Sequence, residues 1–289
     1  MGALGHDAGH SSASRTPWIN EWGLWAMFFI SNPVIWQHQH TYSHHSFTNE
    51  HARDPDVQHF RPLLRSHKES KYRRMCAFQS SALYLFATYT LSVWGSILYL
   101  PIDVLISGSM YGVVSWQSRT RPFQAIGMIL HMAVYELVVI AIPLLTHSSL
   151  RTVALAIYTH LTTIGLIFSL FSQINHLNEP SMELTISKRD PRALHSWAAD
   201  QVETSNNFAI KSQLWYFLSN GLNFQIEHHL FPGLNHCHLY HIAPVVKSTC
   251  AEFSVDYKSY DTVNDLAAAT YKWISKLGIE DEDVELKTE

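Results

Sequence analysis

The apolar positions of this chain are concentrated in three long runs, at residues 77–100, 123–146 and 150–172. Each run exceeds the roughly 20 apolar residues that a helix needs to cross a bilayer. Only residues 147–149 separate the last two runs, so we predict that these two form a tight helical hairpin. The alternative is that all three runs are buried helices of a soluble protein.

The segments outside these runs are more polar. Residues 18–36 are apolar but contain interspersed polar residues and a proline, with tryptophan at both ends, which is typical of a segment in the membrane interface. The amphipathic residues from 245 onward predict a helical cap, and residues 277–289 form an acidic tail.

Basic residues indicate which side of the membrane each loop faces. Residues 53–74 carry seven lysines and arginines, whereas the hairpin turn has only Arg151 beside it. Other basic residues flank the hairpin, at Arg119, Arg121, Lys188, Arg189 and Arg192. The positive-inside rule therefore predicts that residues 37–76, 115–122 and 173–289 are cytosolic.

Composition supports a membrane protein and argues against a nucleic-acid partner. The chain is 47% hydrophobic and only 15% charged, whereas soluble domains carry about 25% charged residues. Its net charge of −4, without a basic stripe, is unlike that of a nucleic-acid-binding protein. Membrane lipid is the expected surrounding.

Histidine is unusually frequent, with 19 residues, and it gathers in four clusters at the edges of the apolar runs. These are "HDAGH" (6–10), "HTYSHH" (40–45), "QINHLNE" (173–179) and "QIEHH" (225–229). On a helix, histidines at i and i+4 share a face and can converge on one cation. Separate surface or core histidines are the alternative, but four clusters on one predicted side of the membrane favour a shared metal site.

The four clusters contain eight histidines at these positions, which is too many for one metal. A zinc site uses three or four ligands, so eight imidazoles can supply two metals. Two metal ions with only nitrogen ligands in a membrane protein indicate iron and oxygen chemistry. Ligand type alone does not exclude zinc. We therefore predict an all-α, integral membrane helical protein with a cytosolic histidine-box di-metal cap, in which residues 1–276 form one domain.

A shared site also constrains the topology. Three crossings between the second and third clusters would leave the clusters on opposite faces, about 30 Å of hydrocarbon apart. The hairpin at about 123–172 is predicted to span. Residues 77–100, the most polar of the three runs, are therefore expected to be interfacial or re-entrant, and to end at Pro101 and Asp103.

The segments "GHDAGH", "HHSFTN", "DPD" and "NFQIEHHLFP" resemble those of the membrane fatty-acid desaturases, over residues 5 to about 276. The family has three histidine boxes, and residues 6–10, 40–45 and 225–229 resemble them in this order. In the third box Gln225 stands in place of the first histidine, which resembles the front-end branch that acts on polyunsaturated acyl chains. The resemblance implies a diiron centre, with O₂ as co-substrate. The implied ligands are His6, His10, His40, His44, His45, His176, His228 and His229.

The sequence departs from the family pattern in three ways. The second box has three residues, not two, before its final histidine pair. No HPGG haem motif is present, so a fused cytochrome b5 domain is absent and a separate cytochrome b5 or ferredoxin is the expected electron donor. The family also has a spanning hairpin before the first box, whereas five residues precede His6, so we expect an N-terminally truncated and poorly active chain.

Further residues near the boxes have expected supporting roles. Basic residues of the 53–74 run, such as Arg65, Lys68 and Lys71, are expected to dock the donor or to contact lipid headgroups. Aromatic residues are candidates for the wall of an acyl tunnel: Trp36, Tyr42, Trp197 and Trp215. Other histidines near the boxes, including His236, are expected to be structural or at the surface. Side chains expected to orient the imidazoles, or to act as weak ligands, are Asp7, Asp54, Asp56, Glu227, Gln173 and Gln225.

The predicted function is O₂-dependent insertion of a cis double bond into a fatty acyl chain, carried by an acyl-lipid or acyl-CoA. A fatty acyl or sphingolipid hydroxylase on the same diiron fold, an inactive truncated desaturase-like protein and a zinc hydrolase are the alternatives. The expected location is the endoplasmic reticulum membrane with the site facing the cytosol, and a plastid membrane is also open.

Overall fold

The computed structural model describes residues 2–61, 63–116, 121–182 and 196–279. Several basic positions used to orient the chain lie outside the described residues, as do residues 280–289 of the acidic tail. Those basic positions are Arg119, Lys188, Arg189 and Arg192.

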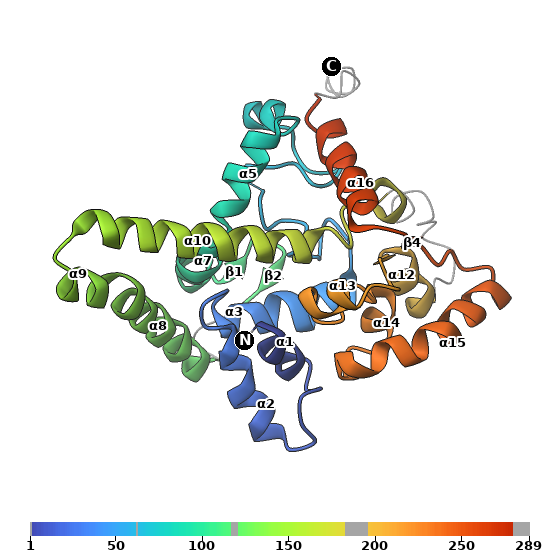
Figure 1. Cartoon of the computed structure of the whole chain (residues 1–289), viewed down its shortest axis with the longest axis horizontal. Coiled ribbons are helices and arrows are strands. Elements are labelled where there is room, and N and C mark those ends of the chain that lie inside the picture. Colours follow the sequence, from blue (N-terminus) through green and yellow to red (C-terminus); the bar gives the residue numbers. More distant parts are fainter. Residues whose placement is uncertain (1, 62, 117–120, 183–195, 280–289) are drawn as a thin grey trace.

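Most of the described chain is helical, which confirms the predicted all-α architecture (Figure 1). The described strands form two small two-stranded sheets. In the first, β1 (Ser109–Met110) pairs antiparallel with β2 (Val114–Ser115). In the second, β3 (Asn207–Phe208) pairs parallel with β4 (Ser259–Tyr260) and so joins two distant parts of the C-terminal region.

Short helices form the N-terminal region and carry the first two histidine clusters. Prolines occupy the first turns of α2 and α3, where a missing N–H leaves no bond unmade. η2 is a π-helix that continues directly from α3. The elements in order are α1 (Gly2–Gly9), α2 (Pro17–Gly23), η1 (Leu24–Met27), α3 (Pro33–Trp36), η2 (Gln37–His44) and α4 (His45–Phe47).

The first long apolar run forms a continuous helical segment from Ala82 to Ser107. The predicted limits of 77–100 were wrong at both ends. The run begins with a separate 3₁₀ turn, η3 (Arg74–Phe78), and the helix passes through Pro101. Pro101 lies in the first turn after a π-helical stretch, where the hydrogen-bond register shifts and its missing N–H is tolerated. The segment comprises α5 (Ala82–Thr90), α6 (Ser92–Trp94), η4 (Gly95–Tyr99) and α7 (Leu100–Ser107).

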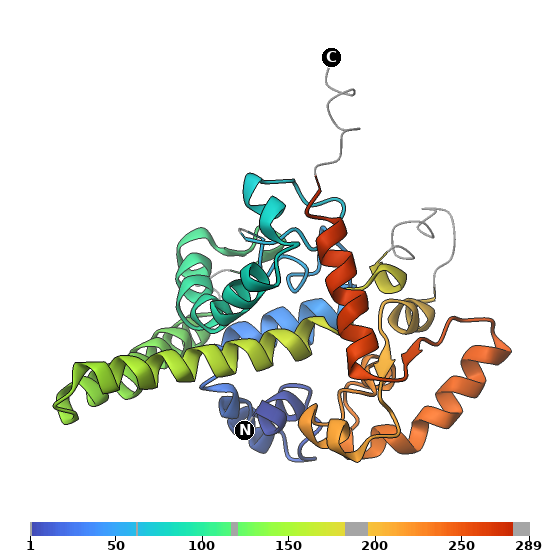
Figure 2. The ribbon, with the colours of Figure 1, turned by 45° about the horizontal axis from the view of Figure 1, so that its top comes forward.

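The second and third runs form the helical hairpin. One arm comprises α8 (Pro122–Glu136), η5 (Leu137–Ala141) and α9 (Ile142–Thr146), and the other is α10 (Leu150–Gln173). In both ribbon views the hairpin projects away from the remaining helices (Figures 1 and 2). Both arms and the 82–107 segment are long and apolar enough to cross a membrane. Exposed leucines near the hairpin turn fit lipid contact.

α10 crosses the junction between α5 and α6 at very close range. A β-carbon on Gly165 would lie 2.8 Å from the carbonyl oxygens of both Tyr89 and Thr90, so only glycine permits this approach. Ser92 Oγ donates a hydrogen bond to the Gly165 carbonyl at the same crossing. The crossing holds the end of α10 that leads to the third histidine cluster.

The C-terminal helices gather at the end of the molecule opposite the hairpin (Figure 1). Val202, Ile226 and Val246 form a small core that joins α12, α14 and α15. On α16, Trp273 packs in a cluster with Leu85 of α5. The elements are α12 (Trp197–Glu203), α13 (Gln213–Leu218), α14 (Gln225–Leu230), η6 (His236–His238), α15 (Leu239–Glu252) and α16 (Val263–Lys276).

Candidate metal centre

The structure brings all eight predicted histidines together in the interior. They come from the end of α1, from η2 and α4, from the turn after α10, and from α14. Their candidate ligand nitrogens fall into two groups, and in each group these atoms lie within 4.8 Å of one another. The first histidine group is His6, His10, His40 and His228, and the second is His44, His176 and His229.

His45 lies between the two groups. Its ring stacks on His229 with centroids 4.2 Å apart and meets His10 at 4.4 Å. Its Nε2 is 3.3 Å from His40 Nε2. His45 therefore completes a set of eight imidazoles that is continuous from one group to the other.

The π-helical form of η2 explains how one short segment serves both groups. In an α-helix, a residue at i+5 lies roughly 140° around the axis from residue i. A π-helix closes i→i+5 hydrogen bonds, which brings positions i, i+4 and i+5 to one face. His40, His44 and His45 have this spacing, and their rings lie within 5.6 Å of one another. The extra residue in the second box is thus absorbed by the wider turn.

Glycine allows α1 to approach η2. A β-carbon on Gly9 would lie 2.2 Å from Trp36 Cζ3, so any larger residue would push the first box away. Trp36 in turn stacks on His40, with ring centroids 4.8 Å apart. The glycine between the two histidines of "HDAGH" therefore has a packing role at the site.

Several buried ring nitrogens lack a hydrogen-bond partner in the described part of the chain. They are His6 Nε2, His10 Nε2, His45 Nδ1, His228 Nε2 and His229 Nε2. A buried polar atom without a partner costs about 1–3 kcal/mol. Metal coordination would give these ring nitrogens the partner that they lack. The residues present therefore suit the predicted two-metal centre.

The opposite ring nitrogens are held by orienting partners. His44 Nδ1 is 2.9 Å from Asp54 Oδ2, and His40 Nδ1 is 3.3 Å from Asp56 Oδ2. The carbonyl oxygen of Thr204 accepts from His176 Nδ1 at 3.1 Å. Each bond fixes a tautomer that leaves Nε2 directed inward, which is the arrangement a metal ligand needs.

Gln201 is an orienting residue that the sequence did not indicate. Its Oε1 accepts from His229 Nδ1 at 2.8 Å, and its amide donates to the carbonyl of His45. It lies on α12, in "WAADQVE", which contains no histidine and no box-like spacing. Only the packing of α12 against α14 brings it to the site.

Two expected orienting residues, Glu227 and Gln173, do not hold an imidazole among the described residues. Both oxygens of Glu227 are engaged, by Asn207 Nδ2 and by the Tyr257 hydroxyl, each at 2.8 Å. Glu227 therefore ties α14 to the β3–β4 sheet instead of holding an imidazole. Gln173 lines the adjacent cavity, and its Oε1 is buried without a partner among the described residues.

Asp7 joins the first box to the loop after the third box. Its Oδ2 accepts from His236 Nδ1 at 2.6 Å and from Asn235 Nδ2 at 2.8 Å. Its contact with His6 Nδ1 is longer, at 3.5 Å. This link is a structural role for His236, which was expected to be structural or at the surface. Gln225, in place of the box histidine, lies 3.0 Å from His176 Nε2.

Six of the eight imidazoles have lowered pKa values. Burial and neighbouring imidazoles lower the pKa of His10, His45, His176, His228 and His229. Burial also lowers the pKa of His40 to about 4, against the opposing effect of Asp56. These six imidazoles are therefore neutral at pH 7, as metal coordination requires.

His44 is the exception among the eight. Burial would lower its pKa, but the charges of Asp54 and Asp56 outweigh that effect and raise it to about 9. The same contacts hold the pKa of Asp56 below its usual range despite burial. His44 therefore has two carboxylates beside its Nδ1, Asp54 at 2.9 Å and Asp56 at 3.6 Å.

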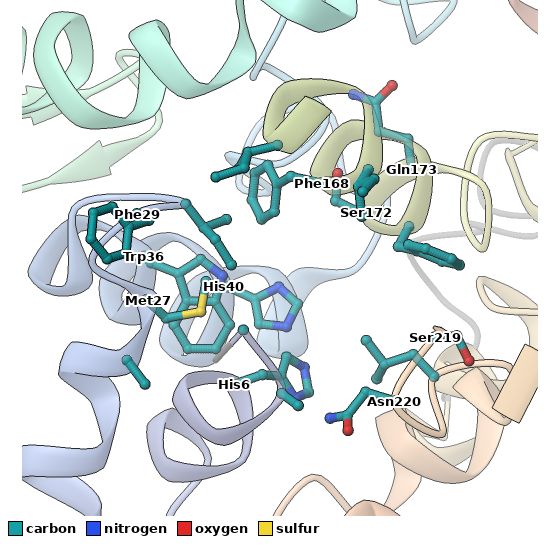
Figure 3. Close-up of a pocket in the computed structure, with 18 of the residues that line it drawn as sticks. His6, Met27, Phe29, Trp36, His40, Phe168, Ser172, Gln173, Ser219 and Asn220 are labelled. Carbon is teal, nitrogen blue, oxygen red and sulfur yellow. The ribbon is translucent and has the colours of Figure 1, made fainter. Parts of the chain in front are cut away.

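An apolar cavity of about 570 Å³ adjoins the histidines. His6 and His40 point into it beside Met27, Trp36 and Phe168 (Figure 3). Of the four aromatic residues predicted for the tunnel, only Trp36 lines this cavity. Trp197 and Tyr42 are about half exposed, and Trp215 packs beside Phe208. The cavity extends along α10, whose apolar face supplies one wall.

Residues 1–261 match the family described as Fatty acid desaturase. This chain belongs to the fatty acid desaturase family. It is accordingly an oxidoreductase that desaturates fatty acyl chains, which confirms the predicted family and enzyme class.

Curated desaturases are similar over most of the chain. An sn-1 linoleoyl-lipid 6-desaturase of Synechocystis sp. is 28% identical over 95% of this chain and 76% of its own length. An acyl-lipid (8-3)-desaturase of Physcomitrium patens is 32% identical over 86% of this chain and 51% of its own. An acyl-lipid (7-3)-desaturase of Rebecca salina is 29% identical over 94% and 60%. The chain thus spans about three quarters of the cyanobacterial relative and about half of the moss one. No solved structure matches the chain.

Proposed function

We propose that the eight histidines hold two iron ions and that the chain inserts a cis double bond near the carboxyl end of a polyunsaturated acyl chain. The observation that carries this proposal is the pair of histidine groups beside an acyl-sized apolar cavity. When bound, the iron supplies the activation of O₂ that removes hydrogen from two neighbouring methylenes. A protein side chain cannot do this chemistry alone.

The protein's own contribution is to position the ligands and the substrate. Asp54, Asp56 and Gln201 hold Nδ1 protons so that Nε2 atoms face inward. Aromatic and aliphatic walls at Trp36 and Phe168 keep water from the acyl chain next to the histidines. Alignment of one carbon–carbon bond with the reacting centre then selects the position of the double bond.

An acyl-lipid is the proposed substrate class. The relatives described above are named for lipid-bound acyl substrates, and each of them is named a desaturase. This naming favours desaturation over the hydroxylase alternative. An acyl-CoA substrate is the second candidate, because the cavity accepts the acyl chain and the two carriers differ only beyond its carbonyl.

A separate cytochrome b5 or ferredoxin is the proposed electron donor. Lys68, Lys71 and Arg74 are exposed on the cytosolic side of the proposed topology. Arg65 was expected to join this surface, but it is buried and donates to the carbonyls of Ser70 and Lys68. Arg65 therefore stabilises the loop, and the docking surface is proposed without it.

The proposed topology keeps both ends of the 82–107 segment on the side of the histidines. In both ribbon views α5 crosses α10 instead of lying alongside it, which supports an interfacial or re-entrant course (Figures 1 and 2). The hairpin spans the membrane, with the metal centre facing the cytosol. The proposed location is the endoplasmic reticulum, with a plastid membrane as the alternative.

Product analysis tests the proposed function. The chain is expressed in a host that lacks front-end desaturases and is supplied with polyunsaturated fatty acids, and the lipids are analysed by mass spectrometry. We expect a new product two mass units lighter, with the added double bond on the carboxyl side of the existing ones. A product sixteen mass units heavier would establish a hydroxylase instead.

A further inference from the structure

The cavity beside the histidines has one long apolar wall and a polar end. Along α10, His160, Ile164, Ile167 and Phe171 line it at helical spacing. From His160 to Ser172 this wall is about 18 Å long at 1.5 Å per residue. The wall runs from the metal centre into the hairpin, so the methyl end of an acyl chain fits toward His160 and its carbonyl end toward the polar end.

Most polar side chains that line the cavity already have partners. His160 Nε2 is 3.0 Å from the Tyr135 hydroxyl, and Gln39 donates to Asp56. Ser219 bonds with Asn223, and Gln225 contacts His176. Such satisfied groups have little affinity left for a ligand.

Three lining atoms are buried without a partner among the described residues: His6 Nε2, Gln173 Oε1 and Asn220 Nδ2. His6 belongs to the first histidine group. Gln173 Oε1 is an acceptor, which cannot bind another acceptor. Asn220 Nδ2 is the hydrogen-bond donor of the three, and a donor is what a carbonyl oxygen requires.

The backbone around Asn220 is built to hold its side chain in place. Asn220 has φ +55° and Gly221 has φ +74°, a left-handed pair that is uncommon for residues other than glycine. The Gly221 N–H donates to the Tyr216 carbonyl at 2.8 Å, and Leu222 N–H donates to that of Ser219. In Figure 3 the Asn220 amide nitrogen is directed toward His6. This turn fixes the position of a donor that has no partner among the described residues.

We propose that Asn220 Nδ2 donates a hydrogen bond to the acyl carbonyl of the substrate and so sets the distance from that carbonyl to the metal centre. The inference rests on the proposed function and adds its specificity determinant. An oxygen ester and a thioester both present this carbonyl. A fixed carbonyl explains how an enzyme can count carbons from the carboxyl end, because the first methylenes must bridge Asn220 and the histidines.

The test compares Asn220→Gly with the wild-type chain. Glycine adopts a positive φ without strain, so this variant removes the donor while favouring the observed backbone. Loss of one neutral hydrogen bond predicts a rise in KM of about three- to tenfold. Because the carbonyl is no longer held, we also expect the new double bond to appear at more than one position. Asn220→Asp, which is nearly isosteric but lacks the donor, is expected to show the same loss.

Ser254→Gly is the matched control. Ser254 also has a positive φ, of 56°, but it is exposed and does not line the cavity, so neither KM nor the bond position is expected to change. Each variant is assayed with an acyl-lipid and with the corresponding acyl-CoA. Whichever carrier the wild type uses, Asn220→Gly is expected to impair that reaction.

Two outcomes would overturn the proposed hydrogen bond from Asn220 to the acyl carbonyl while leaving the proposed function intact. One is an active wild type whose KM and single bond position are retained in Asn220→Gly. The other is a shift of bond position in Gln173→Leu but not in Asn220→Gly. A wild type that makes no double bond with either carrier would overturn the proposed function itself, and with it the proposed role of Asn220.

Discussion

Asp54→Asn tests how the second histidine group is oriented. Asp54 is fully buried, and its Oδ2 lies 2.9 Å from His44 Nδ1 and 2.7 Å from the Asn49 N–H. Its Oδ1 accepts from the Asp56 N–H at 2.8 Å. An asparagine keeps one oxygen, so its NH₂ must face an N–H donor whichever way the amide is turned.

The magnitude follows from these contacts. A buried donor left without an acceptor costs about 1–3 kcal/mol of folding free energy. Loss of the Asp54 charge also removes one of the two carboxylates that raise the pKa of His44, so this pKa falls in the variant. Removal of such an orienting partner typically lowers metal affinity about 10- to 100-fold.

The assay measures iron bound per chain during chelator titration of the purified protein. Asp54→Asn is expected to lose the iron of the second histidine group at about 10- to 100-fold lower chelator concentration, and desaturation is lost with it. Asp256→Asn, the same change at an exposed position, is the control. If Asp54→Asn kept wild-type affinity for both metals and full activity, the orienting role of Asp54 would be refuted.

Three further predictions concern packing, docking and pH. Gly165→Ala is expected to lower the thermal unfolding temperature in detergent by forcing α10 from α5, at a cost of about 1–3 kcal/mol, whereas Gly95→Ala, with open space at its Cβ, is expected to have little effect. Charge reversal at Lys68, Lys71 and Arg74 should weaken donor-dependent activity in a salt-sensitive way, and unchanged activity and salt response would argue for lipid contact alone. The six imidazoles with lowered pKa are protonated near pH 6.5 only when the protein is unfolded. The free energy of unfolding of the metal-free protein is therefore expected to fall as pH drops below 6.5, by at most about 1.4 kcal/mol per imidazole and per pH unit. His44, with its raised pKa, has the opposite trend above that range, because its contribution is fully present below pH 6.5 and is lost as pH rises through about 9. A flat thermal-unfolding profile between pH 7 and 5.5 would contradict the neutral, buried state of the six.

Much of the fold was predictable because it is determined by long apolar runs. The two arms of the hairpin lie where residues 123–146 and 150–172 place them. The limits of the 82–107 segment were not predictable in the same way, because a proline such as Pro101 usually ends a helix. It fails to do so here because a π-helical stretch precedes it, and no composition signal marks such a stretch.

The histidines of the site were predictable from spacing, while their surroundings were only partly so. Asp54 and Asp56 follow the second box closely in sequence, so their contacts with its histidines are local. Gln201 reaches His229 only through the packing of two helices, which spacing does not reveal. Glu227 was misassigned because adjacency to His228 in sequence says nothing about which side of α14 faces the sheet.

Eight histidines are proposed to hold two iron ions for acyl desaturation. Elemental analysis of the full chain, purified without added metal and referred to protein by amino-acid analysis, tests this proposal most directly. Two irons per chain, with a loss of about one iron in Asp54→Asn, is the predicted result. A reproducible value near one metal per chain, or zinc as the native metal, would contradict the account.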